Sequence, residues 1–116
     1  MRNLTRKRML VTVALASAAT VALAATPASA AVITVNVASQ KVPTGARCVF
    51  VTSISSGSIV EASFTLGGTA TIRNLNVQPG ETVAFDWRQS SNCGPDKVRQ
   101  DFYRAPDTLP TVWNIN

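Results

Sequence analysis

QPGETVAFDWR, the stretch at residues 78–88, places a tight turn directly before a strand. Pro79-Gly80 suits the central pair of a type II turn, because proline fixes φ at about −65° and glycine accepts a positive φ. In the strand that follows, Val83, Phe85 and Trp87 share one face, and mostly polar side chains share the other. A strand with one apolar and one polar face is typical of an antiparallel sheet that buries a single side.

The same alternation recurs on both sides of this stretch. Six segments are predicted as strands: Val32–Val37, Ala46–Ile54, Ile59–Leu66, Ala70–Leu75, Thr82–Arg88 and Thr111–Ile115. Short clusters of Gly, Pro, Ser and Asp separate them, and these residues favour turns. Such spacing predicts an all-β fold, a two-sheet sandwich or a small barrel. We favour a small antiparallel sandwich of about six or seven strands.

The segment from Gly94 to Arg104 allows two interpretations. Pro95 at a first helical position, with Val98 and Phe102 one turn apart, suits a short helix. Val98, Gln100 and Phe102, at alternate positions, would equally suit an edge strand. Because the rest of the chain has a β pattern, we expect residues 95–103 to form a strand or an irregular segment.

A hairpin is predicted at Gly67-Gly68-Thr69. A three-residue loop there pairs Phe64 with Ile72 and leaves Arg73 on the outer face. A two-residue turn would place Arg73 on the apolar face instead, since a slip of one residue inverts every side chain.

The first thirty residues have the three parts of a secretory signal peptide. A cationic start precedes an apolar run from Met9 to Ala25, and Ala28-Ser29-Ala30 forms an A-x-A cleavage site. The apolar run is shorter than the roughly 20 residues of a membrane-spanning helix. We therefore expect residues 1–30 to be removed, and residues 31–116 to be a secreted single domain that does not insert into a membrane.

Charge argues against nucleic acid as a partner. The formal net charge of +5 includes four leader cations, and without them it falls to +1. The remaining charges are mixed in sign and dispersed, whereas a nucleic-acid binder carries a basic stripe. We expect a monomer that binds no nucleic acid.

Cys48 and Cys93 are the only two cysteines. Export places them where disulfides persist, so we expect one structural bridge. It closes a long loop and should stabilise a domain this small by about 4 kcal/mol on the chain-entropy argument. Two cysteines this far apart, in a chain without histidine, fit no zinc spacing, so no metal site is predicted.

Catalysis is not expected either. The absence of histidine removes the Ser-His-Asp and Cys-His arrangements and the commonest general base. Lysines and carboxylates show no catalytic spacing, and solvated surface groups account for them: Lys41, Lys97, Asp86, Asp96 and Asp101. We predict a non-enzymatic protein without a cofactor.

With catalysis not expected, we consider binding to a partner, for which two segments are candidate sites. The Arg88–Asp96 loop is polar, follows a strand and carries Cys93, so the disulfide would lower the ordering cost of docking. Within it the candidate contact residues are Arg88, Gln89, Ser90, Ser91 and Asn92. Tyr103 and Arg104, before a proline-containing crossing, form the second candidate, since aromatics and arginine are frequent binding hot spots. Plain structural connections are the alternative for both.

These loops favour a ligand or inhibitor of an extracellular hydrolase, a protease or a glycosidase. The alternative is a carbohydrate- or cell-envelope-binding module in which the ring of Trp113 contacts a polysaccharide. Trp87 is assigned to the core, because it shares a face with Val83 and Phe85. A structural cell-surface protein is a third hypothesis.

Parts of the chain resemble the small secreted α-amylase inhibitors of the tendamistat type. The similar elements are Cys48-Val49 in an early strand, the Val77–Gly80 turn and the Trp87-Arg88 pair. That family has four cysteines in two bridges and places Trp-Arg-Tyr on an early hairpin. This chain has two cysteines, and its triplet is Trp87-Arg88-Gln89, late in the sequence. The resemblance implies a secreted β-protein that inhibits a glycosidase, which ranks inhibition first.

Overall fold

The computed structural model describes residues 29–116. The signal peptide predicted at residues 1–30 therefore lies outside the described residues, apart from Ser29 and Ala30. Within the described part, no helix has the length and apolar character needed to cross a membrane.

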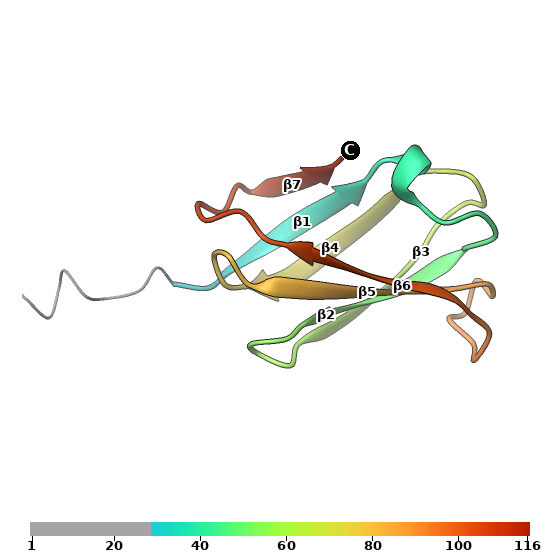
Figure 1. Ribbon diagram of the computed structural model, residues 1–116, viewed down its shortest axis with the longest axis horizontal. Helices are drawn as coiled ribbons and strands as arrows, with labels where there is room; N and C mark the ends of the chain where they lie inside the picture. The colour runs from blue at the N-terminus through green and yellow to red at the C-terminus, as the bar shows by residue number, and fades with distance from the viewer. Residues whose placement is uncertain (1–28) are drawn as a thin grey trace, which may run out of the picture.

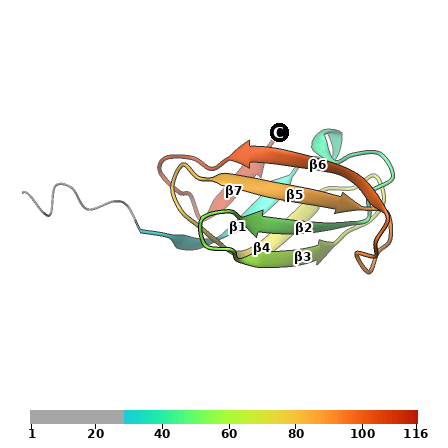
Figure 2. The same cartoon turned by 60° about the horizontal axis from the view of Figure 1, so that its bottom comes forward.

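Seven strands form two stacked sheets (Figures 1 and 2). The strands are β1 (Ala31–Val37), β2 (Cys48–Ser53), β3 (Ile59–Ser63), β4 (Ala70–Val77), β5 (Thr82–Arg88), β6 (Lys97–Arg104) and β7 (Val112–Ile115). One sheet has three strands in the order β4-β1-β7, and the other has four in the order β3-β2-β5-β6. A short 3-10 turn, η1 (Ser39–Lys41), follows β1. The all-β sandwich prediction is confirmed.

Two local predictions are also confirmed. The ambiguous segment after Gly94 is a strand, β6, and it pairs antiparallel with β5. In β5, Val83, Phe85 and Trp87 are fully buried, as the alternation predicts. The preceding turn has Gly80 at φ 73°, a conformation that glycine accepts without strain.

The predicted hairpin at Gly67-Gly68-Thr69 is wrong. β3 pairs with β2 and β4 pairs with β1, so Ile72 lies opposite Val35 rather than Phe64. The segment between β3 and β4 crosses from one sheet to the other. Both strands still bury apolar side chains in the same core, since alternation determines which face is buried but not which strand lies next to it.

The sheets are mostly antiparallel, and the exception joins the first and last strands. β7 runs parallel to β1, with Val35 opposite Trp113. On the other side of β1 the register with β4 shifts between Ile33 and Val35, next to Asn74, whose φ is 62°. Asparagine is one of the few residues that adopts this left-handed conformation readily, so Asn74 accommodates the bulge.

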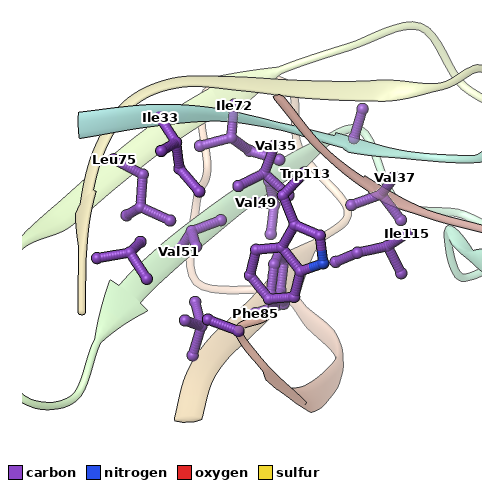
Figure 3. Packing of buried hydrophobic residues seen from close by; sticks show 14 of the residues in the cluster. Ile33, Val35, Val37, Val49, Val51, Ile72, Leu75, Phe85, Trp113 and Ile115 are labelled. Carbon is purple, nitrogen blue, oxygen red and sulfur yellow. The ribbon is translucent and has the colours of Figure 1, made fainter. Parts of the chain in front are cut away.

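The core lies between the two sheets (Figure 3). It is built around stacked and edge-on aromatic rings. The rings of Phe85 and Trp87 are 6.0 Å apart and nearly parallel. Trp113, from the opposite sheet, meets Phe85 edge-on at 6.5 Å. Aliphatic side chains of β1, β2 and β4 fill the rest of the space, among them Ile33, Val51 and Leu75.

The predicted Cys48–Cys93 disulfide is confirmed. It joins the beginning of β2 to the Arg88–Asp96 loop between β5 and β6. The bridge therefore fixes that loop to the four-stranded sheet at one end of the sandwich.

A buried carboxylate, Glu81, connects two turns at the other end of β5. It is 8% exposed, and the Ser53 hydroxyl donates to it at 2.7–2.8 Å. The backbone N–H groups of Ser55 and Gln78 donate at 3.1 and 2.6 Å. Burial alone would raise the pKa of Glu81, but these hydrogen bonds outweigh it and lower the pKa below its ordinary value. Sequence analysis did not predict this set of hydrogen bonds to Glu81, here called the Glu81 clamp.

Candidate functional site

The outward face of the four-stranded sheet carries two rows of side chains that cross all four strands. Directly opposite residues on neighbouring strands point to the same side, so the pairing register defines the rows. The first row is Ile59, Thr52, Ala84 and Phe102, and the second is Glu61, Phe50, Asp86 and Gln100.

Between these rows lies a hollow of about 330 Å³, here called the outer hollow. It is lined by Phe50, Thr52, Ile59, Ala84, Asp86 and Gln100. Its shape follows from side-chain size, because Thr52 and Ala84 are small and stand between the larger Ile59 and Phe102 at the two ends of the first row.

Two large apolar side chains on this face are not covered: Ile59, which lines the hollow, and Phe102, which lies beyond Ala84. Ile59 is 63% exposed and Phe102 is 58% exposed. Both lie in the same cross-strand row, at opposite edges of the sheet. Phe50 and Ala84 line the hollow together with Ile59, and apolar side chains around a surface hollow with a few polar groups are typical of a ligand site.

Three charged groups meet at one side of the hollow. The Arg88 guanidinium donates to Asp86 Oδ2 at 2.7 Å, and Lys97 Nζ lies 3.8 Å from Asp86 Oδ1. Asp86 and Arg88 are mostly covered, with 19% of each side chain exposed. Asp86 Oδ1 and Arg88 Nε are buried and have no hydrogen-bond partner among the described residues. The Asp86 carboxylate therefore keeps unused acceptor capacity beside the hollow.

Arg88 links the hollow to the Arg88–Asp96 loop. Its guanidinium lies over the Phe50 ring, 5.5 Å from the centroid. The same guanidinium donates to the carbonyl oxygens of Gly94 and Pro95, at 3.3 and 3.2 Å. The Arg88 side chain therefore packs against the loop and supports it.

Several further contacts fix this loop. The Ser63 hydroxyl donates to the Ser91 carbonyl at 2.6 Å, which ties the loop to β3, and the disulfide ties it to β2. The Gln89 N–H donates to the Asp96 carbonyl at 3.0 Å and closes the base of the loop. Cys93 has φ 54°, a strained conformation for this residue that persists where the surroundings impose it.

The exposed residues of the loop include Gln89, Ser91 and Asn92, while Ser90 is half-buried. Figure 2 shows the loop extending past the strand ends at the right of the four-stranded sheet. Of the candidates predicted in this loop, the structure thus presents the three polar residues to solvent and places Arg88 behind them.

Tyr103 and Arg104 lie apart from the loop, near the opposite end of β6. The Tyr103 ring is half-buried and meets Phe85 edge-on at 5.3 Å. Burial, and next the nearby Asp101 carboxylate, raise the pKa of the Tyr103 phenol. Arg104 is exposed and its guanidinium donates to Asp107 at 2.9 Å. The two predicted segments therefore do not form one site.

Trp113 does not present its ring to solvent. It is 8% exposed and packs in the core against Phe85, as Figure 3 shows. The prediction that Trp113 contacts a polysaccharide is therefore wrong. The side chains of β7 alternate, and the parity that buries Ile115 also buries Trp113.

Sequence reasoning missed Phe50, Ile59, Gln100 and Phe102 as a group. A usable signal existed in β2, where apolar Phe50 occupies the outward parity between buried Val49 and Val51. A strand with apolar residues at both parities indicates that its outer face is covered or binds something. The row itself depends on pairing between strands distant in sequence, which the alternation alone does not give.

The Glu61 carboxylate lies close to the disulfide, with its oxygen and both sulfurs within 4.8 Å of one another. The sulfurs are bonded to each other and so are not thiolate ligands.

Asp101, on β6, accepts hydrogen bonds from Trp87 Nε1 and from the Arg99 guanidinium at 2.9–3.1 Å. These contacts close the edge of the core.

Comparison with known protein families, with curated proteins and with solved structures finds no match for this chain.

Proposed function

We propose that this protein is a small extracellular binding protein that acts as a ligand or inhibitor of a hydrolase, a protease or a glycosidase such as an α-amylase. The observation that supports the proposal best is the Arg88–Asp96 loop, which extends from the end of the sandwich while a disulfide and side-chain hydrogen bonds hold it. Docking a loop that is already ordered avoids most of the conformational entropy lost when a flexible segment binds.

Each part of the loop has a distinct role in this proposal. Gln89, Ser91 and Asn92 supply exposed hydrogen-bonding groups for the partner. Arg88 acts indirectly, because its guanidinium is engaged by Asp86 and by two loop carbonyls. Replacing Arg88 should therefore weaken binding by loosening the loop rather than by removing a contact.

The leader-like sequence at residues 1–30 and the resemblance to secreted α-amylase inhibitors also support this function. The structural disulfide is compatible with an oxidising compartment. The same features support a target outside the cell.

The test is an inhibition assay against a panel of extracellular α-amylases, other glycosidases and serine proteases. We expect saturable inhibition of at least one enzyme with Kd of about 1 μM or below, the range of specific protein complexes. In the variant Asn92→Trp a bulky ring on the exposed loop should abolish inhibition. Its matched control is Asn76→Trp, on the exposed face of β4 in the other sheet, which should inhibit normally.

Two results would overturn the proposal. One is the absence of inhibition across the panel at protein concentrations tens of times above about 1 μM. The other is equal loss of inhibition in Asn92→Trp and Asn76→Trp, because the loop would then have no special part in binding.

A further inference from the structure

We infer that the outer hollow binds a neutral saccharide, in addition to the loop-mediated binding proposed above. The inference rests on the side chains that line the hollow and does not depend on the hydrolase. Three of these side chains are apolar and three carry hydrogen-bonding groups: Phe50, Ile59 and Ala84, then Thr52, Asp86 and Gln100. A sugar ring presents the same combination of an apolar C–H face and hydroxyl groups.

Asp86 lines the hollow and its Oδ1 is buried without a hydrogen-bond partner, so a ligand with hydroxyl donors would satisfy it once the surrounding side chains adjust. A carboxylate has about four lone-pair positions, and Asp86 receives its hydrogen bond from Arg88. Lys97 Nζ, at 3.8 Å, is too far for a hydrogen bond to Oδ1. Gln100 on β6 and Thr52 on β2 lie on either side, so hydroxyl groups of one ligand have partners across the sheet.

The charged side chains around the hollow make an ionic ligand a poorer fit than a neutral one. Arg88 and Lys97 both lie against Asp86, so a cation would meet a site whose carboxylate is already neutralised. An anion would approach the Asp86 carboxylate and the exposed Glu61 at the end of the same row. The two positive and two negative groups balance, which favours a neutral molecule.

A purely aliphatic ligand, such as an acyl chain, fits less well. It would cover the Asp86 carboxylate and the Gln100 amide without supplying hydrogen bonds, and burying unpaired polar groups is unfavourable. The apolar side chains here are also arranged as separate contacts rather than as an enclosed channel. Ile59 and Phe102 stand at opposite edges of the sheet, with small Thr52 and Ala84 between them.

The dimensions favour a chain of sugar units over a single one. The hollow, about 330 Å³, lies at the lower end of the usual range of ligand sites, roughly 300–1,000 Å³. The row from Ile59 to Phe102 crosses three strand spacings, about 14 Å in total. An oligosaccharide laid along this row would place a ring in the hollow and a second ring against the exposed face of Phe102.

The test is a ¹H–¹⁵N NMR titration of the purified protein with maltohexaose, cellohexaose, chitohexaose and xylohexaose. We expect one of them to produce saturable shifts with Kd of about 1 mM, as suits a shallow site. The shifting amides should belong to the two rows of the four-stranded sheet. The chemical shifts of the backbone amides of β1, β4 and β7, in the other sheet, should not change, which would show that the effect is specific.

Two pairs of variants sharpen the titration. Gln100→Ala and Phe102→Ala should each weaken binding about tenfold, since each removes a partner from an exposed position without disturbing the core. Their matched controls are Asn76→Ala and Val32→Ala, exposed residues of the other sheet, which should leave Kd unchanged. Asp86→Asn is less suitable alone, because it also disturbs Arg88 and the loop.

The inference is overturned if none of the four hexasaccharides gives saturable shifts, or if the shifts map elsewhere on the protein. It is also overturned if a hydrolase, but no saccharide, shifts the amides of the hollow, since the hollow would then belong to a protein interface. Inhibition by the Arg88–Asp96 loop is measured without these sugars, so either proposal can fail while the other stands.

Discussion

The outer faces of the two sheets differ, although in a sandwich both are exposed. On the three-stranded sheet the outward positions are dominated by small polar side chains, including Thr34, Asn36, Asn76 and Asn114. On the four-stranded sheet the outward positions include Phe50, Ile59 and Phe102, a hollow and an ion cluster.

This difference shows which outward side chains are not explained by the requirements of folding. The inward positions of both sheets follow from one requirement, which is to bury apolar surface in a shared core. The outward positions of the three-stranded sheet are mostly polar, and the exposed apolar residues among them, Val32 and Val112, lie beside polar Asn76 and Thr34. Exposed Ile59 and Phe102 do not contribute to the core, since they are uncovered and lie outside it. Together with Phe50 and the outer hollow, they mark the face that we expect to bind.

The largest expected effect concerns the disulfide, which anchors the loop to the four-stranded sheet alone. The double variant Cys48→Ala/Cys93→Ala should lose about 4 kcal/mol of stability, because the unfolded chain gains the entropy of an open loop. Urea unfolding followed by tryptophan fluorescence measures the loss. A loss below about 1 kcal/mol would mean that the bridge constrains the loop and contributes little to the sandwich.

The next effect concerns Glu81, which joins turns at the far end of the same sheet. Glu81→Gln keeps the shape but turns an amide N–H₂ toward donors from Ser53, Ser55 or Gln78. We expect a loss on the order of 3 kcal/mol, as is usual when a buried charged acceptor is removed. The conservative control is Glu61→Gln, exposed on β3, which should change stability by less than about 0.5 kcal/mol.

Glu81 also predicts a dependence on pH. Its folded pKa lies below the ordinary value of 4.5, so the unfolded chain binds more protons in acid. The contribution of Glu81 is therefore fully present well above pH 4.5 and is lost as the pH falls through the folded pKa. The free energy of unfolding of the wild type should fall as the pH falls over this range, and the share of that fall due to Glu81 should be absent in Glu81→Gln. Parallel curves for the two proteins would contradict the clamp.

A smaller effect is expected for Arg88→Lys. Lysine keeps a positive charge beside Asp86 but cannot donate at the same time to Gly94 and Pro95, as the guanidinium does. We expect a loss of about 1–2 kcal/mol and faster amide hydrogen exchange in the Arg88–Asp96 loop. Arg73→Lys, exposed on β4, is the matched control and should leave exchange unchanged. Unchanged exchange in Arg88→Lys would show that the disulfide suffices to order the loop.

Much of the fold could be predicted from the sequence because the inner faces alternate cleanly. Val83, Phe85 and Trp87 identify their strand and its buried side, and the two cysteines identify the bridge. The crossing from β3 to β4 could not be predicted, and a hairpin pairing Phe64 with Ile72 was expected in its place, since a strand that crosses to the other sheet buries the same side chains. The Arg88–Asp96 loop was found from its cysteine and polar residues, whereas the outer hollow depends on pairing Ile59, Thr52, Ala84 and Phe102 across four strands.

The smallest effect on stability tests the comparison of the two faces most directly. Phe102→Thr and Val32→Thr each replace an exposed apolar residue on a strand with a residue of good β propensity. Each should change stability by less than about 0.5 kcal/mol, because neither side chain belongs to the core. An apolar fluorescent dye such as bis-ANS should nevertheless bind less well to Phe102→Thr only, since Phe102 lies directly opposite Ala84, which lines the outer hollow. Equal dye binding by both variants would mean that the two outer faces are equivalent, and that exposed Phe102 carries no more functional meaning than exposed Val32.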